Sequence, residues 1–155
     1  MSQYDENKVL DTIEKATKSV VNISTVKLVH NIFYQAVPVA GMGSGTIIDN
    51  DGLVLTNNHV VGGAEKINVT LWNNQVLEGT IVGQCQVHDT AVVRVKAKNL
   101  PAMELGDSDK LRVGQRVYGL DLAVLDSAAV LPPALFAIAV SAGLMDGTPR
   151  RNTAP

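Results

Sequence analysis

Short runs of β-branched and aliphatic residues, separated by turn-forming residues, dominate the chain from residue 19 onwards. Asp51-Gly52 lies between two such runs, and glycine accepts the positive φ angle that a tight hairpin requires. Asn73-Asn74-Gln75 separates two more in the same way. Many short strands with turns between them are typical of an antiparallel barrel or sandwich. We expect strands over residues 19–29, 45–50, 53–57, 65–72, 76–84 and 89–97, and one more near 115–120.

One helix is expected before these strands. Apolar residues recur at helical spacing between residues 5 and 17. The 155 residues suffice for one typical domain, and 46% of them are hydrophobic, which is enough to build a core. Because aromatic residues make up only 4% of the chain, Val, Leu, Ile and Ala must form most of that core.

Composition argues against several classes of function. The net charge is −2 and no Lys/Arg cluster stands out, so nucleic-acid binding has no electrostatic support. The single Cys85 excludes an intrachain disulfide, and we interpret it as a small residue at a strand end with no base beside it. His30, His59 and His88 lack the close spacing of metal ligands, so we expect no metal site. No cofactor motif is found, because "GMGSGT" lacks the spacing of a phosphate loop.

Two segments bear on membranes and export. The N-terminus has neither a basic stretch nor an apolar stretch, so we expect no signal peptide, and the compartment stays open. Residues 127–145 carry no charge, but Pro132 and Pro133 interrupt them and leave too few residues for a comfortable membrane span. We therefore expect a buried strand or an irregular apolar segment there.

The stretch "LVLTNNHVVGG" (Leu53–Gly63) places a histidine at the end of an expected strand, a position that suits a catalytic base. Its surroundings, "GSGTIIDNDGLVLTNNHVV" (Gly43–Val61), closely resemble the HtrA/Deg branch of the trypsin-like serine proteases. A second stretch, "HDTAVVRVKAKNLPAMELGDSDKLRVGQRV" (His88–Val117), resembles the following strand and loop of that family in order and spacing. The resemblance covers about residues 5–118.

The resemblance implies a mainly β fold, with a six-stranded antiparallel Greek-key barrel as the first of two barrels. It also implies that His59 is the general base and Asp89 the carboxylate that orients it. An imidazole accepts a serine proton near neutral pH, and the carboxylate holds the required tautomer. His88 precedes Asp89 on the expected strand, so we expect it to face the opposite, exposed side. The resemblance further implies unfolded polypeptide or peptide substrates, a homo-oligomer (a trimer in the family) and frequent location outside the cytoplasm.

The nucleophile of this family lies in its second barrel, within a Gly-Asn-Ser-Gly-Gly-Pro segment, and these 155 residues contain no such segment. Ser44 and Ser141 do not fit a nucleophile motif, and Ser108 lies between two carboxylates. We therefore divide the chain into the helix and first barrel (1–118) and a divergent apolar tail (119–155) that is at most the start of a second barrel.

The resemblance thus implies the base and orienting carboxylate of a DegP-like serine endopeptidase, of the protein quality control class. The sequence predicts no nucleophile and no oxyanion loop, so the chain alone should be inactive. The alternative is a non-catalytic β-barrel that binds peptides or acts like a chaperone. A third reading is that the tail is an altered reading of a longer protein, because the character of the sequence changes abruptly near Gly119.

Overall fold

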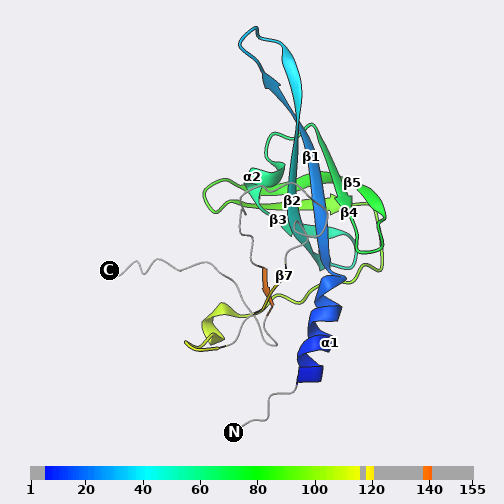
Figure 1. Cartoon of the computed structure of the whole chain (residues 1–155), viewed down its shortest axis with the longest axis vertical. Coiled ribbons are helices and arrows are strands. Elements are labelled where there is room, and N and C mark those ends of the chain that lie inside the picture. Colours follow the sequence, from blue (N-terminus) through cyan, green and yellow to red (C-terminus); the bar gives the residue numbers. More distant parts are fainter. Residues whose placement is uncertain (1–5, 116–117, 121–137, 141–155) are drawn as a thin grey trace, which may run out of the picture.

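Six strands close into a barrel in which every neighbouring pair is antiparallel, in the order β1-β2-β3-β6-β5-β4 (Figure 1). The computed structural model describes residues 6–115, 118–120 and 138–140. The barrel strands are β1 (Val20–His30), β2 (Ala36–Asp49), β3 (Leu53–Thr56), β4 (Lys66–Thr70), β5 (Val76–Cys85) and β6 (Thr90–Val95). Since β3 is followed in sequence by β4 but pairs with β6, the barrel is not a simple meander. The expected mainly β fold with a six-stranded barrel is confirmed.

The core of the barrel consists almost entirely of aliphatic side chains, as the low aromatic content predicts. Burial alternates along the strands, for example in the pattern of β6, because successive side chains of a strand point to opposite faces. The fully buried apolar side chains include Val21, Ile23, Ile47, Val54, Val61, Val69 and Val93.

Helix α1 (Glu6–Thr17) precedes the barrel and leads directly into β1, as Figure 1 shows. Ala16 is buried, and the backbone N–H of Ser19 donates to the carbonyl of Ala16 at 2.9 Å, which ends the helix in a tight turn. The helix expected over residues 5–17 is confirmed to within one residue at its start.

The hairpin of β1 and β2 is longer than the sequence predicts and projects beyond the barrel (Figure 1). The two strands stay paired from Val20↔Thr46 to His30↔Ala36, so β2 begins nine residues before the expected position 45. β propensity does not predict this part of β2, because Pro38 and several glycines in it have low strand propensity. Long-range pairing with β1, rather than local preference, makes it a strand.

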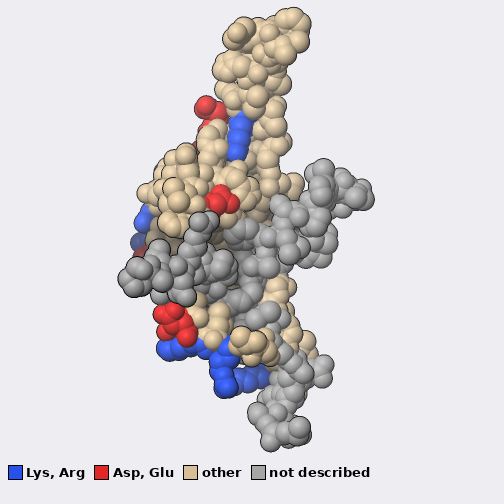
Figure 2. Space-filling view, turned by 90° about the vertical axis from the view of Figure 1, so that its left-hand side faces the viewer, with Lys and Arg blue, Asp and Glu red and all other residues tan. Residues whose placement is uncertain are grey.

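The tip of this hairpin exposes apolar side chains. Ile32, Phe33 and Tyr34 are 86%, 73% and 89% exposed, so three consecutive apolar side chains lie mostly in solvent. Asn31 orders the tip, because its side-chain oxygen accepts hydrogen bonds from the backbone N–H groups of Phe33 and Gln35. No Asp, Glu, Lys or Arg lies between Lys27 and Asp49, and Figure 2 shows the projecting end without charged side chains.

Both expected hairpin turns are present. Gly52, between β2 and β3, has a φ of +100°, and a Cβ there would lie 2.3 Å from the carbonyl oxygen of Val95. Only glycine fits this turn without displacing the neighbouring strand end. Between β4 and β5, Asn74 adopts a positive φ and the backbone N–H of Leu71 donates to Gln75 O at 2.9 Å.

After the barrel come a short 3₁₀ helix, η1 (Ser108–Lys110), and an antiparallel pair of three-residue strands, β7 (Tyr118–Leu120) and β8 (Ile138–Val140). The strand expected near 115–120 is thus found as β7. Most of the uncharged segment 127–145 lies outside the described residues, and β8 is the part of it that is described. Among the described residues, no helix has both the length and the apolar character required to cross a bilayer.

Candidate active site

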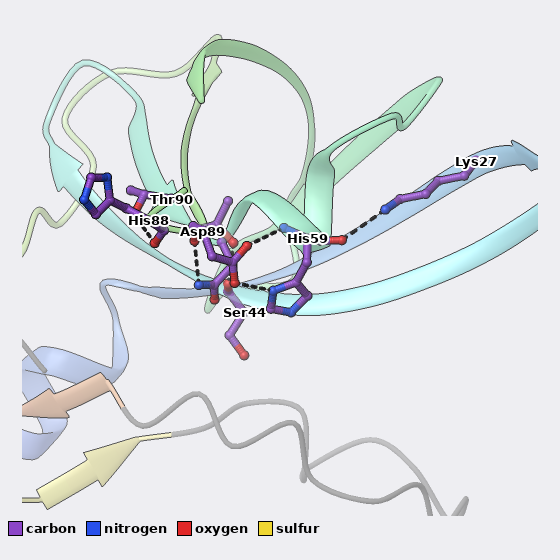
Figure 3. Close-up of polar contacts among 8 residues, drawn as sticks. Lys27, Ser44, His59, His88, Asp89 and Thr90 are labelled. Carbon is purple, nitrogen blue, oxygen red and sulfur yellow. Dashed lines mark hydrogen bonds and ion pairs between the residues drawn. The ribbon is translucent and has the colours of Figure 1, made fainter. Parts of the chain in front are cut away.

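His59 and Asp89 lie 30 positions apart in the sequence and meet at one end of the barrel (Figure 3). His59 is on a one-turn helix, α2 (Asn58–Val61), that follows β3 directly. Asp89 is in the turn between β5 and β6. Because β3 and β6 are hydrogen-bonded neighbours, with Thr56 opposite Ala91, the end of one strand and the beginning of the other bring the two residues together.

The carboxylate of Asp89 holds His59 at two points. The ring nitrogen Nδ1 of His59 lies 2.6 Å from Asp89 Oδ2, and the backbone N–H of His59 donates to Oδ1 at 2.8 Å. The side-chain hydrogen bond with His59 is the main cause that lowers the pKa of Asp89 below its ordinary value, so the carboxylate is ionised at neutral pH. The side chains of His59 and Asp89 are 59% and 44% exposed, so the pair is open to solvent on the described surface.

This geometry selects one tautomer of a neutral His59. An ionised carboxylate only accepts hydrogen bonds, so Nδ1 must carry the proton that is shared with Asp89. The other ring nitrogen, Nε2, then has a free lone pair, and Figure 3 shows it pointing away from Asp89. A histidine in this state can accept a proton from a group that approaches Nε2.

The structure corrects the expected position of Asp89 at the start of a strand over residues 89–97. Asp89 has a φ of +49°, a left-handed conformation that a strand residue does not adopt, and β6 begins at Thr90. The carbonyl of Asp89 accepts hydrogen bonds from Asn58 N at 3.2 Å and from Asn57 Nδ2 at 2.8 Å. These bonds hold the turn against the beginning of α2, and Asp is one of the few residue types that tolerate this backbone conformation.

Two further residues position α2, and neither was assigned a role from the sequence. Lys27 on β1 donates from Nζ to the carbonyl of His59 at 3.0 Å. Gly43 on β2 lies directly beneath Val60, and a Cβ at this position would lie 2.6 Å from a methyl group of Val60. The local signal for Gly43 was its place in the family-like "GSGT" stretch, whereas a contact as distant in sequence as that of Lys27 leaves no local signal.

Of the serines considered in the sequence, Ser44 does not face His59 (Figure 3). Ser44 is buried in β2, its carbonyl accepts a hydrogen bond from Thr56 Oγ1 at 2.8 Å, and its hydroxyl points away from the imidazole in Figure 3. Ser108 lies in η1, whose N-cap Asp107 accepts from Asp109 N. Ser141 is outside the described residues. Among the described residues, no three His, Cys, Asp or Glu side chains gather as a metal site would require.

The expected surroundings of Cys85 and His88 are only partly correct. His88 is exposed, as predicted, but it lies in the turn before β6 rather than on a strand. Its ring nitrogen Nδ1 lies 3.2 Å from the sulfur of Cys85, so a base does stand beside this thiol. The sequence spacing Cys-x-x-His was the available signal, because a tight turn brings residues i and i+3 together.

Comparison with known proteins identifies the family of this barrel. A family model described as a trypsin-like peptidase domain matches residues 43–148. The putative serine protease HhoB of Synechocystis sp. (strain ATCC 27184 / PCC 6803 / Kazusa) is 52% identical over 75 residues, which are 48% of this chain and 18% of the relative. A probable periplasmic serine endoprotease, DegP-like, from Marinomonas sp. (strain MWYL1) is 34% identical over an alignment of 173 residues, which covers 90% of this chain and 35% of the relative.

Among solved structures, the HtrA-type protease AlgWS227A with a decapeptide matches with a TM-score of 0.65 at 32% identity. The match covers 68% of this chain and 38% of that one. The chain therefore spans only a part, between about a sixth and two fifths, of the proteins that it matches. With the family model extending over more than half of its residues, the chain belongs to the trypsin-like peptidase family, and its barrel is similar to that of the HtrA-type, DegP-like serine proteases.

Proposed function

We propose that this barrel supplies the general base, His59, and the orienting carboxylate, Asp89, of an HtrA/DegP-like serine endopeptidase site. The observation that supports it is the contact between His59 Nδ1 and Asp89 Oδ2, at 2.6 Å, which leaves Nε2 to accept a proton. In the reaction, Nε2 takes the proton of a serine hydroxyl as the hydroxyl attacks a peptide carbonyl, and returns it to the leaving amine. Asp89 stabilises the imidazolium that forms between these steps.

We also propose a substrate class for this site and its dependence on a second barrel. The solved relatives hold a decapeptide or a tripeptide, so polypeptide is the substrate that we propose for this site. The 155 residues contain no Gly-Asn-Ser-Gly-Gly-Pro segment, so the nucleophile must come from residues outside them. We expect the chain alone to lack peptidase activity, because loss of the nucleophile costs about six decades of kcat in a serine protease.

A chimeric protease tests these roles. Residues 6–115 of this chain are joined to the second barrel of AlgW, and casein hydrolysis and fluorophosphonate labelling are measured. We expect His59→Ala to lower kcat by about six decades and Asp89→Asn by about four. His30→Gln is the matched control, because this exposed histidine lies at the far end of the β1–β2 hairpin. The proposal fails if the His59→Ala chimera cleaves casein as fast as its parent.

The second candidate function is a non-catalytic barrel that binds apolar polypeptide segments, and the exposed hairpin tip of Ile32, Phe33 and Tyr34 favours it. A chain with this role should suppress the aggregation of a heat-denatured client protein. The double variant Ile32→Ser/Phe33→Ser should then lose the suppression, while His59→Ala should keep it. Equal suppression by the wild type and the tip variant would remove this candidate.

A further inference from the structure

We propose that Cys85 and His88 form a second reactive pair, in which the thiol is a modification site for hydroperoxides and for soft carbon electrophiles. The pair is built from side chains that the proposed peptidase chemistry does not use. Cys85 Sγ lies 3.2 Å from His88 Nδ1, a distance at which sulfur and an imidazole nitrogen share a proton. The proposal is independent of whether the barrel works in a peptidase.

The turn between β5 and β6 fixes the position of both groups. Cys85 is the last residue of β5 and pairs with Thr90, the first residue of β6. Within the turn, Asp89 N donates to Gln86 O at 3.2 Å, and Thr90 Oγ1 donates to the carbonyl of His88 at 3.0 Å. These bonds fix the backbone of His88 close to the thiol, within reach of its imidazole.

The surroundings of the thiol favour its ionised form and leave it accessible. Hydrogen bonds from the His88 backbone and imidazole, the largest causes, lower the pKa of the Cys85 thiol. Among the described residues, His88 is the ionisable side chain that contributes to this shift. The opposite residue on β6, Thr90, is neutral, and the carboxylate of Asp89 binds His59. Cys85 is only partly buried and His88 is exposed, so small reagents can reach the sulfur.

The reaction of the Cys85 thiolate with a hydroperoxide needs no cofactor. The thiolate sulfur attacks the terminal oxygen of a hydroperoxide, an S–O bond forms and the O–O bond breaks. The sulfur is oxidised to a sulfenic acid while the hydroperoxide is reduced to an alkoxide, which takes its proton from the imidazolium of His88 and leaves as the alcohol. With iodoacetamide, an S–C bond forms and iodide leaves, so alkylation reports the same thiolate.

Alkylation kinetics test the proposal, and intact mass suffices because Cys85 is the only cysteine. Rates of alkylation by iodoacetamide are measured between about pH 5 and 9.5 for the native chain and for the same chain unfolded in urea. In the unfolded chain the thiol has its ordinary pKa of about 8.5. We expect the midpoint of the native profile to lie at lower pH. His88→Gln should move it back towards the profile of the unfolded chain, while His30→Gln, on the distant hairpin, should not change it.

Oxidation gives a second readout. After treatment with one equivalent of cumene hydroperoxide, dimedone should label the wild-type chain several-fold faster than His88→Gln. The comparison of native and unfolded wild type does not depend on the folding of any variant. Coincident profiles for native and unfolded chains, or equal alkylation and dimedone labelling of wild type and His88→Gln, would overturn the proposal.

Discussion

At the scale of single residues, the contact between His59 and Asp89 makes the folded state depend on pH. The lowered pKa of Asp89 means that the folded chain holds its carboxylate ionised to a lower pH than the unfolded chain does. The stabilisation is therefore fully present above the pKa of Asp89 in the unfolded chain, about 3.9. It is lost as the pH falls through the pKa of Asp89 in the folded chain.

This dependence predicts the behaviour of Asp89→Asn. At pH 7 the variant should unfold at a lower urea concentration than the wild type, with a loss below about 1 kcal/mol because the pair is exposed. At a pH well below 3 the two midpoints should converge. Asp51→Asn, in the exposed β2–β3 turn, is the control and should match the wild type at both pH values. A gap that is as wide in acid as at pH 7 would contradict the sign of the Asp89 shift.

At the scale of elements, the position of α2 depends on a glycine, Gly43, in the strand β2 beneath it. Gly43 lets Val60 pack against β2, and α2 carries His59 one residue before that contact. Inserting a methyl group at a close-packed position typically costs about 1–3 kcal/mol through displaced neighbours.

Gly43→Ala should therefore lower the thermal unfolding midpoint and shift the NMR signals of the His59 imidazole, because α2 must move. Gly83→Ala is the matched control, since a Cβ at this strand position meets nothing within 4 Å. It should change neither quantity appreciably. Unchanged His59 signals in Gly43→Ala would show that α2 is not held by this contact.

At the scale of the whole molecule, the β1–β2 hairpin projects beyond the barrel (Figure 1). Residues 28–48 of this hairpin include no Asp, Glu, Lys or Arg, and the tip exposes Ile32, Phe33 and Tyr34 (Figure 2). Apolar groups gathered in this way favour association between molecules. Figure 1 shows the tip clear of the barrel, so it can reach a second copy of the chain.

We therefore expect the chain to self-associate. Sedimentation velocity should show species larger than the monomer, and Ile32→Ser/Phe33→Ser should shift the distribution towards the monomer. Lys98→Ser, an exposed change away from the hairpin, is the control. A wild-type chain that sediments as a monomer at every concentration would contradict this expectation.

The sequence predicted most of the barrel because its turns and strands have local causes. Gly52 and Asn74 mark their turns by residue type, and β-branched residues mark the strands between them. The early part of β2 escaped prediction because Pro38 and its glycines have low strand propensity, and only pairing with β1 makes it extended. Local rules describe a residue by its neighbours in sequence, and this strand depends on a partner across the hairpin.

The same distinction applies to the candidate site. His59 and Asp89 were proposed from their motifs, and the structure brings them within hydrogen-bonding distance. The left-handed turn at Asp89, the donor Lys27 and the neighbour of Cys85 were not predicted. Each depends on how β5, β6 and β1 meet in space, which residue types alone do not specify.

The most direct test of the central claim is the protonation state of His59 in the chain itself. With ¹⁵N-labelled histidine, NMR at a pH above the imidazole titration distinguishes a ring nitrogen that carries a proton from one that does not. We expect a protonated Nδ1 and an unprotonated Nε2 for His59 in the wild type, and loss of this preference in Asp89→Asn. A wild-type His59 with its proton on Nε2 would contradict the claim, because an Nε2 that already carries a proton cannot accept one from a nucleophile.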